Sequence, residues 1–159
     1  ANPLGYEGFD LKLDEARKKT GLRSSCITFE TRMDGINAVV ICLAAPFRGG
    51  SVGAAEGEKI IRAAERAQRK QLPLIFYAHG TAGIRIQEGT NGVLQMPRCT
   101  MALRKVITET TGIPVPPNYH NAWNALARGH IQGIWDRREM GRNIGQALMT
   151  MGGRNLYYR

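Results

Sequence analysis

The sequence has few cysteines, and their spacing fits neither a metal site nor a disulfide framework. Its 159 residues include three, Cys26, Cys42 and Cys99, which lie far apart. Metal-binding cysteines recur at short intervals and disulfide frameworks use even numbers, so we expect free thiols that are buried or half-buried, as in a reducing compartment. Histidines and carboxylates also lack metal-ligand spacing, and we therefore predict no bound metal.

Long hydrophobic runs are also missing. The longest apolar stretch, residues 38–45, has eight residues, whereas a helix that crosses a bilayer needs about 20. The first residues, Ala1, Asn2 and Pro3, do not form the basic and then apolar pattern of a signal peptide. We therefore expect a cytoplasmic protein with no membrane segment.

Acidic residues are scarce relative to basic ones. The chain has 22 lysines and arginines against 13 aspartates and glutamates, a formal charge of +9. Such an excess suits the phosphates of a nucleotide-like ligand, an acidic partner protein or nucleic acid. A solvated basic surface accounts for it equally well. Since the basic residues are dispersed and not interleaved with aromatic ones, nothing further favours nucleic acid, and we expect none to bind.

The central part of the chain alternates between strand-like and helix-like patterns. Near-continuous apolar residues over 36–45 predict a strand that is covered on both faces. The turn residues Asp34 and Gly35 predict a hairpin with the strand before it. The full set of expected elements comprises strands over 27–32, 36–45, 72–78 and 131–135, a strand start broken by prolines over 113–117, and helices over 11–20, 54–70, 87–110 (interrupted, with a new segment or kink at Pro97), 120–128 and 137–149. This order predicts an α/β fold with crossover connections.

Two loops of small residues each follow a predicted strand and lead into a helix. They are Gly49–Gly53 and Thr81–Ile84. Small residues let the backbone approach a ligand closely, and we expect the helix starts to present unpaired N–H groups. Such loops can hold a phosphate or the oxygen of a carbonyl that becomes an enolate. The same glycines also suit tight strand-to-helix turns, and neither loop has a GxGxxG or GxxxxGK[ST] fingerprint.

Several segments, taken in order, resemble one enzyme family. They read NPL at 2–4, KKTGL at 18–22, GGSVG at 49–53, GEKI at 57–60, LPLI at 72–75, TAGIRIQEG at 81–89, LQM at 94–96 and GHIQGIWDRREM at 129–140. They are similar to the DPL, KKTGL, GGSMG, GEK, LPLI, SGGARMQEG and GxID-xIVxRxEM segments of the β subunit of bacterial-type acetyl-CoA carboxylase carboxyltransferases. Each segment alone is unspecific, whereas the ordered set is specific.

The resemblance implies a crotonase-like (ClpP/crotonase) α/β fold with a β-β-α superhelix core, here in shortened form. We expect one domain over residues 1–159 that lacks the family's zinc ribbon and part of its central segment. The match departs from the family at Ala82, which replaces the first of two paired glycines. The shortened core would expose apolar surface, so we also expect another subunit to cover it.

The resemblance further implies a site and a reaction. Backbone N–H groups of Ala82, Gly83, Gly49 and Gly50 would hold the oxygen of the thioester, as an oxyanion hole does. The expected substrate-binding residues are Ser51, Val52, Thr81, Ile84, Arg85, Lys59 and Arg62. For the two basic residues on the first long helix, Lys59 and Arg62, a solvated basic face is the other interpretation.

On this basis we expect an enzyme subunit that binds an acyl-CoA or carrier-protein thioester and stabilises its enolate during biotin-dependent carboxyl transfer, as in fatty acid biosynthesis. No cofactor would bind directly, because an α-type partner subunit would supply carboxybiotin in a hetero-oligomer. Two alternatives stay open. One is decarboxylation of a malonyl thioester, and the other is a non-catalytic structural or regulatory partner of a fuller homologue.

Overall fold

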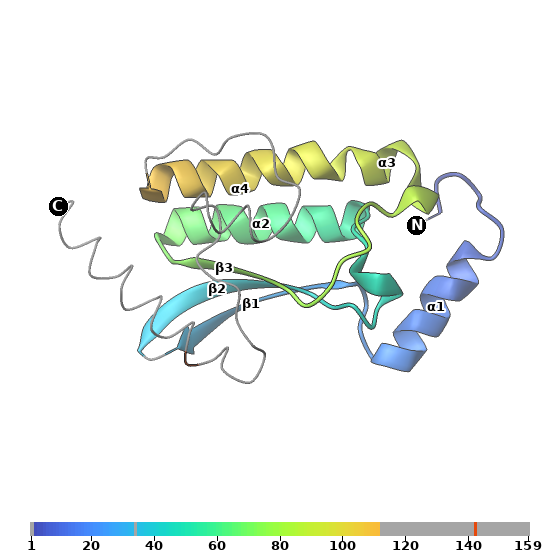
Figure 1. Cartoon of the computed structure of the whole chain (residues 1–159), viewed down its shortest axis with the longest axis horizontal. Coiled ribbons are helices and arrows are strands. Elements are labelled where there is room, and N and C mark those ends of the chain that lie inside the picture. The colour runs from blue at the N-terminus through green and yellow to red at the C-terminus, as the bar shows by residue number, and fades with distance from the viewer. Residues whose placement is uncertain (1, 34, 112–141, 143–159) are drawn as a thin grey trace.

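The computed structural model describes residues 2–33, 35–111 and 142, and the sequence predictions beyond Thr111 lie outside these residues, Arg142 excepted. A three-stranded sheet has one long helix on one face, a second long helix packed along the first, and a shorter helix at one end (Figure 1). In chain order the elements are α1 (Phe9–Thr20), β1 (Cys26–Met33), β2 (Ile36–Leu43), the 3-10 turn η1 (Arg48–Gly50), α2 (Ala54–Lys70), β3 (Leu74–Ala78), the 3-10 turn η2 (Ile86–Glu88), α3 (Thr90–Val93) and α4 (Gln95–Thr111). The predicted α/β alternation is confirmed.

The strands lie in the order β1, β2, β3. β1 and β2 form the predicted antiparallel hairpin, with Met33 opposite Ile36 at its tip. β3 joins β2 in parallel, as a crossover through α2 requires. Because β2 is the central strand, its residues Ala38 to Ile41 are all buried, which accounts for the near-continuous apolar run in the sequence.

Helix α2 has the bounds that the apolar periodicity predicts. Its buried residues include Ile60, Ala64 and Ala67, which face the sheet and α4. Burying a side chain the size of Ile60 contributes roughly 1.5–3 kcal/mol. Gly57 brings α4 unusually close, because a Cβ built there would lie 2.3 Å from Oε1 of Gln95.

The interrupted helix expected over 87–110 consists of three separate elements. Gly89, with a φ of +57°, ends η2 and precedes α3. Pro97 lies in the first turn of α4, where its missing N–H has no helical partner to lose. This confirms that a new helical segment starts near Pro97. None of the helices in the described ranges is long and apolar enough to cross a membrane.

Helix α1 closes the end of the sheet nearest to η1 (Figure 1). It begins at Phe9, two residues earlier than predicted, and ends at Thr20 as predicted. The next residue, Gly21, caps the helix with a left-handed φ of 69°. Phe9 and Leu13 pack against Phe47 in a second, smaller hydrophobic cluster. This cluster fixes the segment that leads into the first glycine loop.

Candidate functional site

The two glycine loops lie side by side at the carboxyl ends of β2 and β3. The N–H of Val52 donates to the carbonyl of Gly83 (2.8 Å), and the N–H of Arg85 donates to the carbonyl of Val52 (2.8 Å). Val52 and Ile84, both predicted substrate contacts, thereby form an isolated parallel bridge. Ligands of open α/β sheets bind at this edge, so the structure brings together the two loops that the sequence indicated.

Glycine is required where the loops touch. A Cβ built on Gly50 would lie 1.9 Å from the carbonyl oxygen of Gly80, and one built on Gly49 would lie 3.1 Å from the Cβ of Ala82. Both glycines also have a positive φ, which is 67° at Gly49 and 74° at Gly50. The interpretation that these glycines allow a tight turn is therefore correct, and the tight turn is what places the loops in contact.

The start of α2 departs from our expectation of unpaired N–H groups. The N–H of Gly53 donates to Oε2 of Glu56 (3.0 Å), and the N–H of Ala54 donates to Oε2 of Glu88 (2.7 Å). Two carboxylates of the chain itself therefore occupy the positive end of this helix. A ligand phosphate or oxyanion has no free donor at Gly53 or Ala54.

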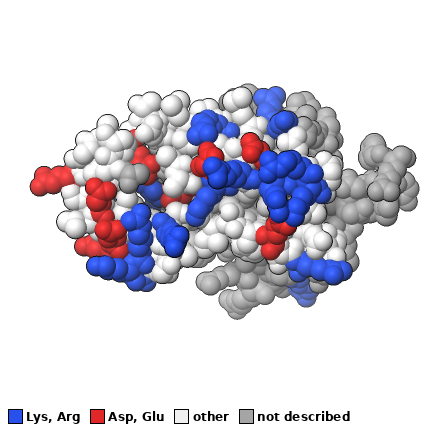
Figure 2. All heavy atoms as spheres, turned by 180° about the vertical axis from the view of Figure 1, so that it is seen from behind, with Lys and Arg blue, Asp and Glu red and all other residues white. Residues whose placement is uncertain are grey.

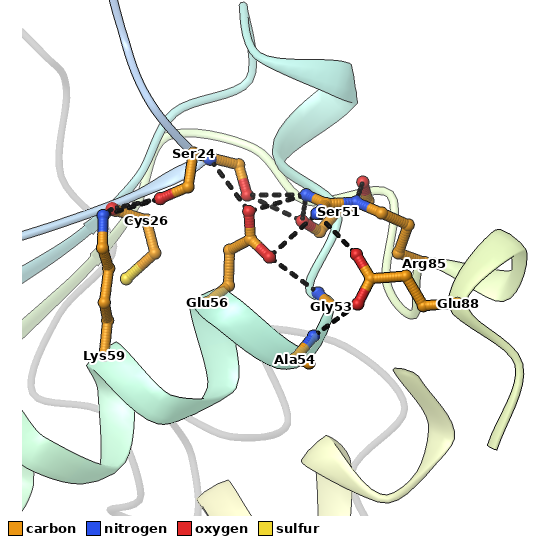
Figure 3. Close-up of polar contacts among 10 residues, drawn as sticks. Ser24, Cys26, Ser51, Gly53, Ala54, Glu56, Lys59, Arg85 and Glu88 are labelled. Atoms are coloured by element: carbon orange, nitrogen blue, oxygen red, sulfur yellow. Dashed lines mark hydrogen bonds and ion pairs between the residues drawn. The ribbon is translucent and has the colours of Figure 1, made fainter. Parts of the chain in front are cut away.

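Arg85 joins both carboxylates in a buried cluster (Figure 3). Its Nη2 and Nη1 donate to the two oxygens of Glu56 at 2.8 and 2.9 Å, and Nη1 also donates to Oε1 of Glu88 at 3.0 Å. The side chains of Arg85, Glu56 and Glu88 are 4%, 0% and 4% exposed. One cation and two anions leave a net negative charge, which the dipole of α2 and the amide donors offset.

The carboxyl group of Glu56 stays ionised in spite of its burial. Burial raises its pKa, but the hydrogen bonds and positive charge of Arg85, together with backbone N–H donors, lower the pKa by more. The pKa of Glu56 is therefore below its ordinary value of 4.5. Glu56 is therefore the carboxylate that accepts hydrogen bonds from both Arg85 and the N–H of Gly53.

Two serines connect this cluster to the first loop and to the start of β1. Nη2 of Arg85 donates to the carbonyl of Ser51 (2.8 Å), and Oγ of Ser25 donates to the same carbonyl (2.7 Å). Nε of Arg85 donates to Oγ of Ser51 (3.2 Å). Arg85 and Ser51, both predicted substrate contacts, are thus buried and bound to each other, where they hold the two loops together.

The other two basic residues predicted to bind substrate point elsewhere. Nζ of Lys59 donates to Oγ of Ser24 (2.7 Å) and to the carbonyl of Cys26 (2.9 Å), at the start of β1 (Figure 3). Arg62, whose side chain is 76% exposed, pairs with Glu58. The solvated-face interpretation therefore describes Arg62, and Lys59 is a structural contact.

Other basic side chains on the outside of α2 are paired in the same way. Arg66 and Lys70 share the carboxylate of Glu30, and Arg98 of α4 reaches Glu58. Figure 2 shows the basic side chains of this side of the molecule standing next to acidic ones. These ion pairs balance basic charge locally, but they leave the net charge of +9 unchanged.

Only part of the predicted set of amide donors is available for a ligand. The N–H of Gly50 donates to the carbonyl of Phe47 (2.9 Å), and the N–H of Gly83 donates to Oγ1 of Thr81 (3.1 Å). In the described part of the chain, the N–H groups of Gly49 and Ala82 have no hydrogen-bond acceptor. Each loop therefore has one unpaired amide, on residues so close that a Cβ built on Gly49 would lie 3.1 Å from the Cβ of Ala82.

Ala82 fits its position without backbone strain. Among the described residues other than glycine, only Arg48 and Gln71 have a positive φ. Gly83, which follows Ala82, has a φ of +73° and open space around its Cα, so it makes the turn. The change from glycine to alanine at position 82 therefore preserves both the turn and the amide donor.

Sequence reasoning missed Glu56 and Ser25. The spacing of Gly53 and Glu56 is that of a capping box, in which a residue at the third helical position returns to the N-cap amide, and this signal identifies Glu56. Glu88 also caps α2, although it lies 34 residues after the amide of Ala54 that it accepts from. Across the described ranges, no group of histidine, cysteine, aspartate and glutamate residues could hold a metal ion.

The thiols are as predicted from their spacing. Cys26 and Cys99 are buried and Cys42 is half-buried, and all three are free. Burial raises the pKa of Cys26 to about 12, although the charge of Lys59 acts in the opposite direction. None of them is therefore a ready nucleophile.

The sequence relatives of the chain among known proteins include carboxyltransferase subunits. No family model matches the chain. The acetyl-coenzyme A carboxylase carboxyl transferase subunit beta of Clostridium botulinum, from strains Langeland and Okra, is 38% identical over 108 residues. The match covers 68% of this chain and 37% of the relative, so the chain spans little more than a third of the length of these curated relatives.

The solved structures that resemble the chain align with it less completely. Transcarboxylase 12S with hydrolysed methylmalonyl-coenzyme A bound is 23% identical over 51% of this chain and 16% of its own, with a TM-score of 0.49. The Pseudomonas malonate decarboxylase MdcD-MdcE hetero-dimer is 28% identical over 54% of this chain and 39% of its own, with a TM-score of 0.46. The assignment therefore rests on the sequence relatives and on the observed β-β-α order. The chain is a relative of the acetyl-CoA carboxylase carboxyltransferase β subunit, with an α/β core.

Proposed function

We propose that the chain is the thioester-binding part of a carboxyltransferase-type complex. It binds an acyl-CoA, or an acyl group on a carrier protein, and stabilises the enolate of that thioester. The observation that carries this proposal is the pair of unpaired N–H groups of Gly49 and Ala82, one on each of two loops joined by the Val52–Ile84 bridge. The likeness to carboxyltransferase β subunits supports the reaction class.

The chemistry requires two donors aimed at one oxygen. The α-proton of the acyl thioester would pass to the biotin that is left when carboxybiotin gives up its carboxyl group, and the electron pair would move onto the carbonyl oxygen. The resulting enolate carbon would then bond to the released carboxyl group. A preorganised N–H donor at this oxygen lowers the barrier by about 2.7–4 kcal/mol. In this proposal Gly49 and Ala82 are the donors, because the N–H of Gly50 is already bonded to Phe47. Gly83 becomes a donor only if it leaves Thr81.

Rigidity of the loops supports the proposal. Preorganised donors are effective because they need no rearrangement as charge develops. Arg85 ties the carbonyl of Ser51 to Glu56, while Glu88 holds the first amide of α2. The loops are thus fixed from the buried side, and the exposed side at Gly49 and Ala82 is left for substrate.

Carboxybiotin would come from an α-type partner subunit, and the complex would be a hetero-oligomer. The names of the relatives describe subunits, and the chain spans only about a third of their length. A second candidate is that the chain is a non-catalytic structural partner of a fuller carboxyltransferase homologue, because Arg85, Lys59 and the N–H of Gly50 are all bonded within the chain. In that case the loops would retain their shape without binding a thioester.

The test uses the chain co-purified with an acetyl-CoA carboxylase carboxyltransferase α subunit. The complex is assayed for carboxylation of acetyl-CoA with carboxybiotin and for decarboxylation of malonyl-CoA, and turnover of either supports the proposal. Ala82→Pro removes one donor and should lower kcat by about 100-fold or more. Ala82→Ser retains the N–H and should keep most of the activity.

Two results would overturn the enzymatic proposal. One is a folded, intact complex that turns over neither substrate, which leaves the structural-partner candidate. The other is an Ala82→Pro complex as active as the wild type, which shows that this amide does not act on the reacting oxygen. Circular dichroism of both variants separates these results from simple misfolding.

A further inference from the structure

Arg48 is a half-buried cation that has no partner in the described part of the chain. It forms no ion pair or side-chain hydrogen bond there, and its Nε is buried without an acceptor. Lys59 and Arg85, the other basic residues of the described ranges that are not exposed, are both hydrogen-bonded. Charges that leave solvent in proteins are normally paired. The cation of Arg48 therefore lacks a counter-charge among these residues.

An aromatic contact holds the guanidinium group of Arg48. Its central carbon lies 5.9 Å from the centre of the ring of Phe9, and that ring belongs to the second hydrophobic cluster, with Phe47. The face of a ring attracts a cation but accepts no in-plane hydrogen bond from it. Nε is the one nitrogen of this side chain that is both buried and unpaired, so the two terminal nitrogens reach solvent. Their N–H groups are thus open to a ligand.

The backbone of Arg48 is strained in a way that no helix end explains. Among the described residues other than glycine, only Arg48 and Gln71 have a positive φ, which is 50° at Arg48 and 52° at Gln71. Gln71 caps the carboxyl end of α2, where left-handed backbone is normal. Arg48 instead begins η1, in the first glycine loop. Because strained residues of this kind cluster at ligand-binding sites, the backbone and the unpaired side chain indicate the same role.

We infer that Arg48 is the recognition residue of a phosphate-binding site beside the first glycine loop. A guanidinium presents N–H groups in a fork that matches two oxygens of a phosphate. The negative charge of the phosphate supplies the counter-charge that the half-buried cation lacks. The net charge of +9 also favours an anionic ligand. This inference goes beyond the proposed function, because a phosphate site at Arg48 requires no thioester. CoA and free phosphate are the two sources of this group that the experiment separates.

The experiment titrates the full chain with three probes in an isothermal titration calorimeter. The probes are inorganic phosphate, CoA, and pantetheine, which is the thiol-bearing part of CoA without its phosphates. Ionic strength is kept constant so that screening is the same for all three. Wild type should bind both phosphate-bearing probes, and pantetheine at least about 10-fold more weakly than CoA. Arg48→Met should weaken binding of the phosphate-bearing probes by about 10-fold or more and leave pantetheine unchanged.

Two further variants separate a specific contact from net charge. Arg104→Met removes the same charge from an exposed position on α4 that has no ion pair within the described ranges. It should leave all three dissociation constants close to those of wild type, because exposed charges at a distance are screened. Arg48→Lys keeps the charge without the planar fork, so its affinity for phosphate should lie between those of wild type and Arg48→Met.

Stability provides a second readout. Methionine is unbranched, like the stem of arginine, and leaves no buried N–H donor unpaired. Arg48→Met should therefore unfold at a urea concentration no lower than that of wild type. A structural arginine would behave in the opposite way. Loss of stability in Arg48→Met without loss of phosphate affinity would overturn the inference.

The titrations also decide the source of the phosphate. Arg48-dependent binding that is tighter for CoA than for inorganic phosphate supports the inference with CoA as the source. Equal Arg48-dependent affinities support it with free phosphate as the source. The inference fails if neither phosphate-bearing probe binds through Arg48, or if Arg104→Met weakens binding as much as Arg48→Met. Turnover by the complex tests the proposed function separately, so either can fail without the other.

Discussion

Arg85 and Glu56 form a bidentate ion pair inside the molecule, with nitrogen-to-oxygen distances of 2.8 and 2.9 Å. Arg85 follows the second glycine loop, and Glu56 lies in the first turn of the helix after the other loop. The pair therefore fixes the two loops relative to each other from the buried side. Planar guanidinium suits this task because its N–H groups form a rigid fork that matches a carboxylate.

Removing the guanidinium should destabilise the fold strongly. Arg85→Met leaves the buried carboxylates of Glu56 and Glu88 without their cation, which costs about 3–5 kcal/mol. Arg69→Met is the matched control, because Arg69 is 67% exposed and its nitrogen is 4.0 Å from Glu65. That change should cost less than about 1 kcal/mol. Urea unfolding gives both free energies, and equal values would contradict the role assigned to Arg85.

The stability of the protein should depend on the ionisation of Glu56 at acidic pH. Its folded-state pKa lies below the ordinary value of 4.5. Its contribution is therefore complete above pH 4.5 and is lost as the pH falls through the folded-state pKa. Glu56→Gln should be less stable than wild type at neutral pH, with a flatter decline on acidification. Parallel pH profiles for the two proteins would contradict this account.

Gly50 should tolerate alanine worse than Gly35, a glycine that also has a positive φ but has free space around it. Gly50 and Gly35 have φ values of 74° and 84°, so alanine incurs the left-handed penalty of about 1–2 kcal/mol at both positions. A Cβ at Gly50 also meets the carbonyl of Gly80, whereas nothing lies within 4 Å of a Cβ at Gly35. Gly50→Ala should therefore cost about 1–3 kcal/mol more than Gly35→Ala. Thermal or urea unfolding measures this difference, and equal costs would show that the loops are not packed as described.

Alkylation should rank the thiols by burial. Burial raises the pKa of Cys26 to about 12 and also raises the pKa of Cys42 and Cys99, so thiolate is scarce at all three. Cys42 is the half-buried one and should react first with iodoacetamide at pH 8. Mass spectrometry of peptides follows the order, and urea should abolish it. Modification of Cys26 before Cys42 in the folded protein would be incompatible with the packing of β1.

The sequence was most informative where local patterns determine structure. The spacing of apolar residues predicts the bounds of α2, and the turn residues Asp34 and Gly35 predict the β1–β2 hairpin. Both features depend on residues that are close in the sequence. The resemblance predicts Arg85 as a substrate contact, but its pairing with Glu56, 29 residues earlier, is one that no local pattern encodes. Lys59 was misassigned for the same reason, since Ser24 lies 35 residues before it. The positions of the glycine loops were predictable from the sequence. That most of their N–H groups form hydrogen bonds within the chain was not.

The most direct test of the account follows amide resonances while acetyl-CoA is added to a ¹⁵N-labelled chain in the complex. A hydrogen bond to the thioester oxygen should shift the signals of Gly49 and Ala82, whose N–H groups have no acceptor among the described residues. Gly53 and Ala54, whose N–H groups are held by Glu56 and Glu88, should move little. Shifts at Gly53 and Ala54 with none at Gly49 and Ala82 would contradict the proposed site.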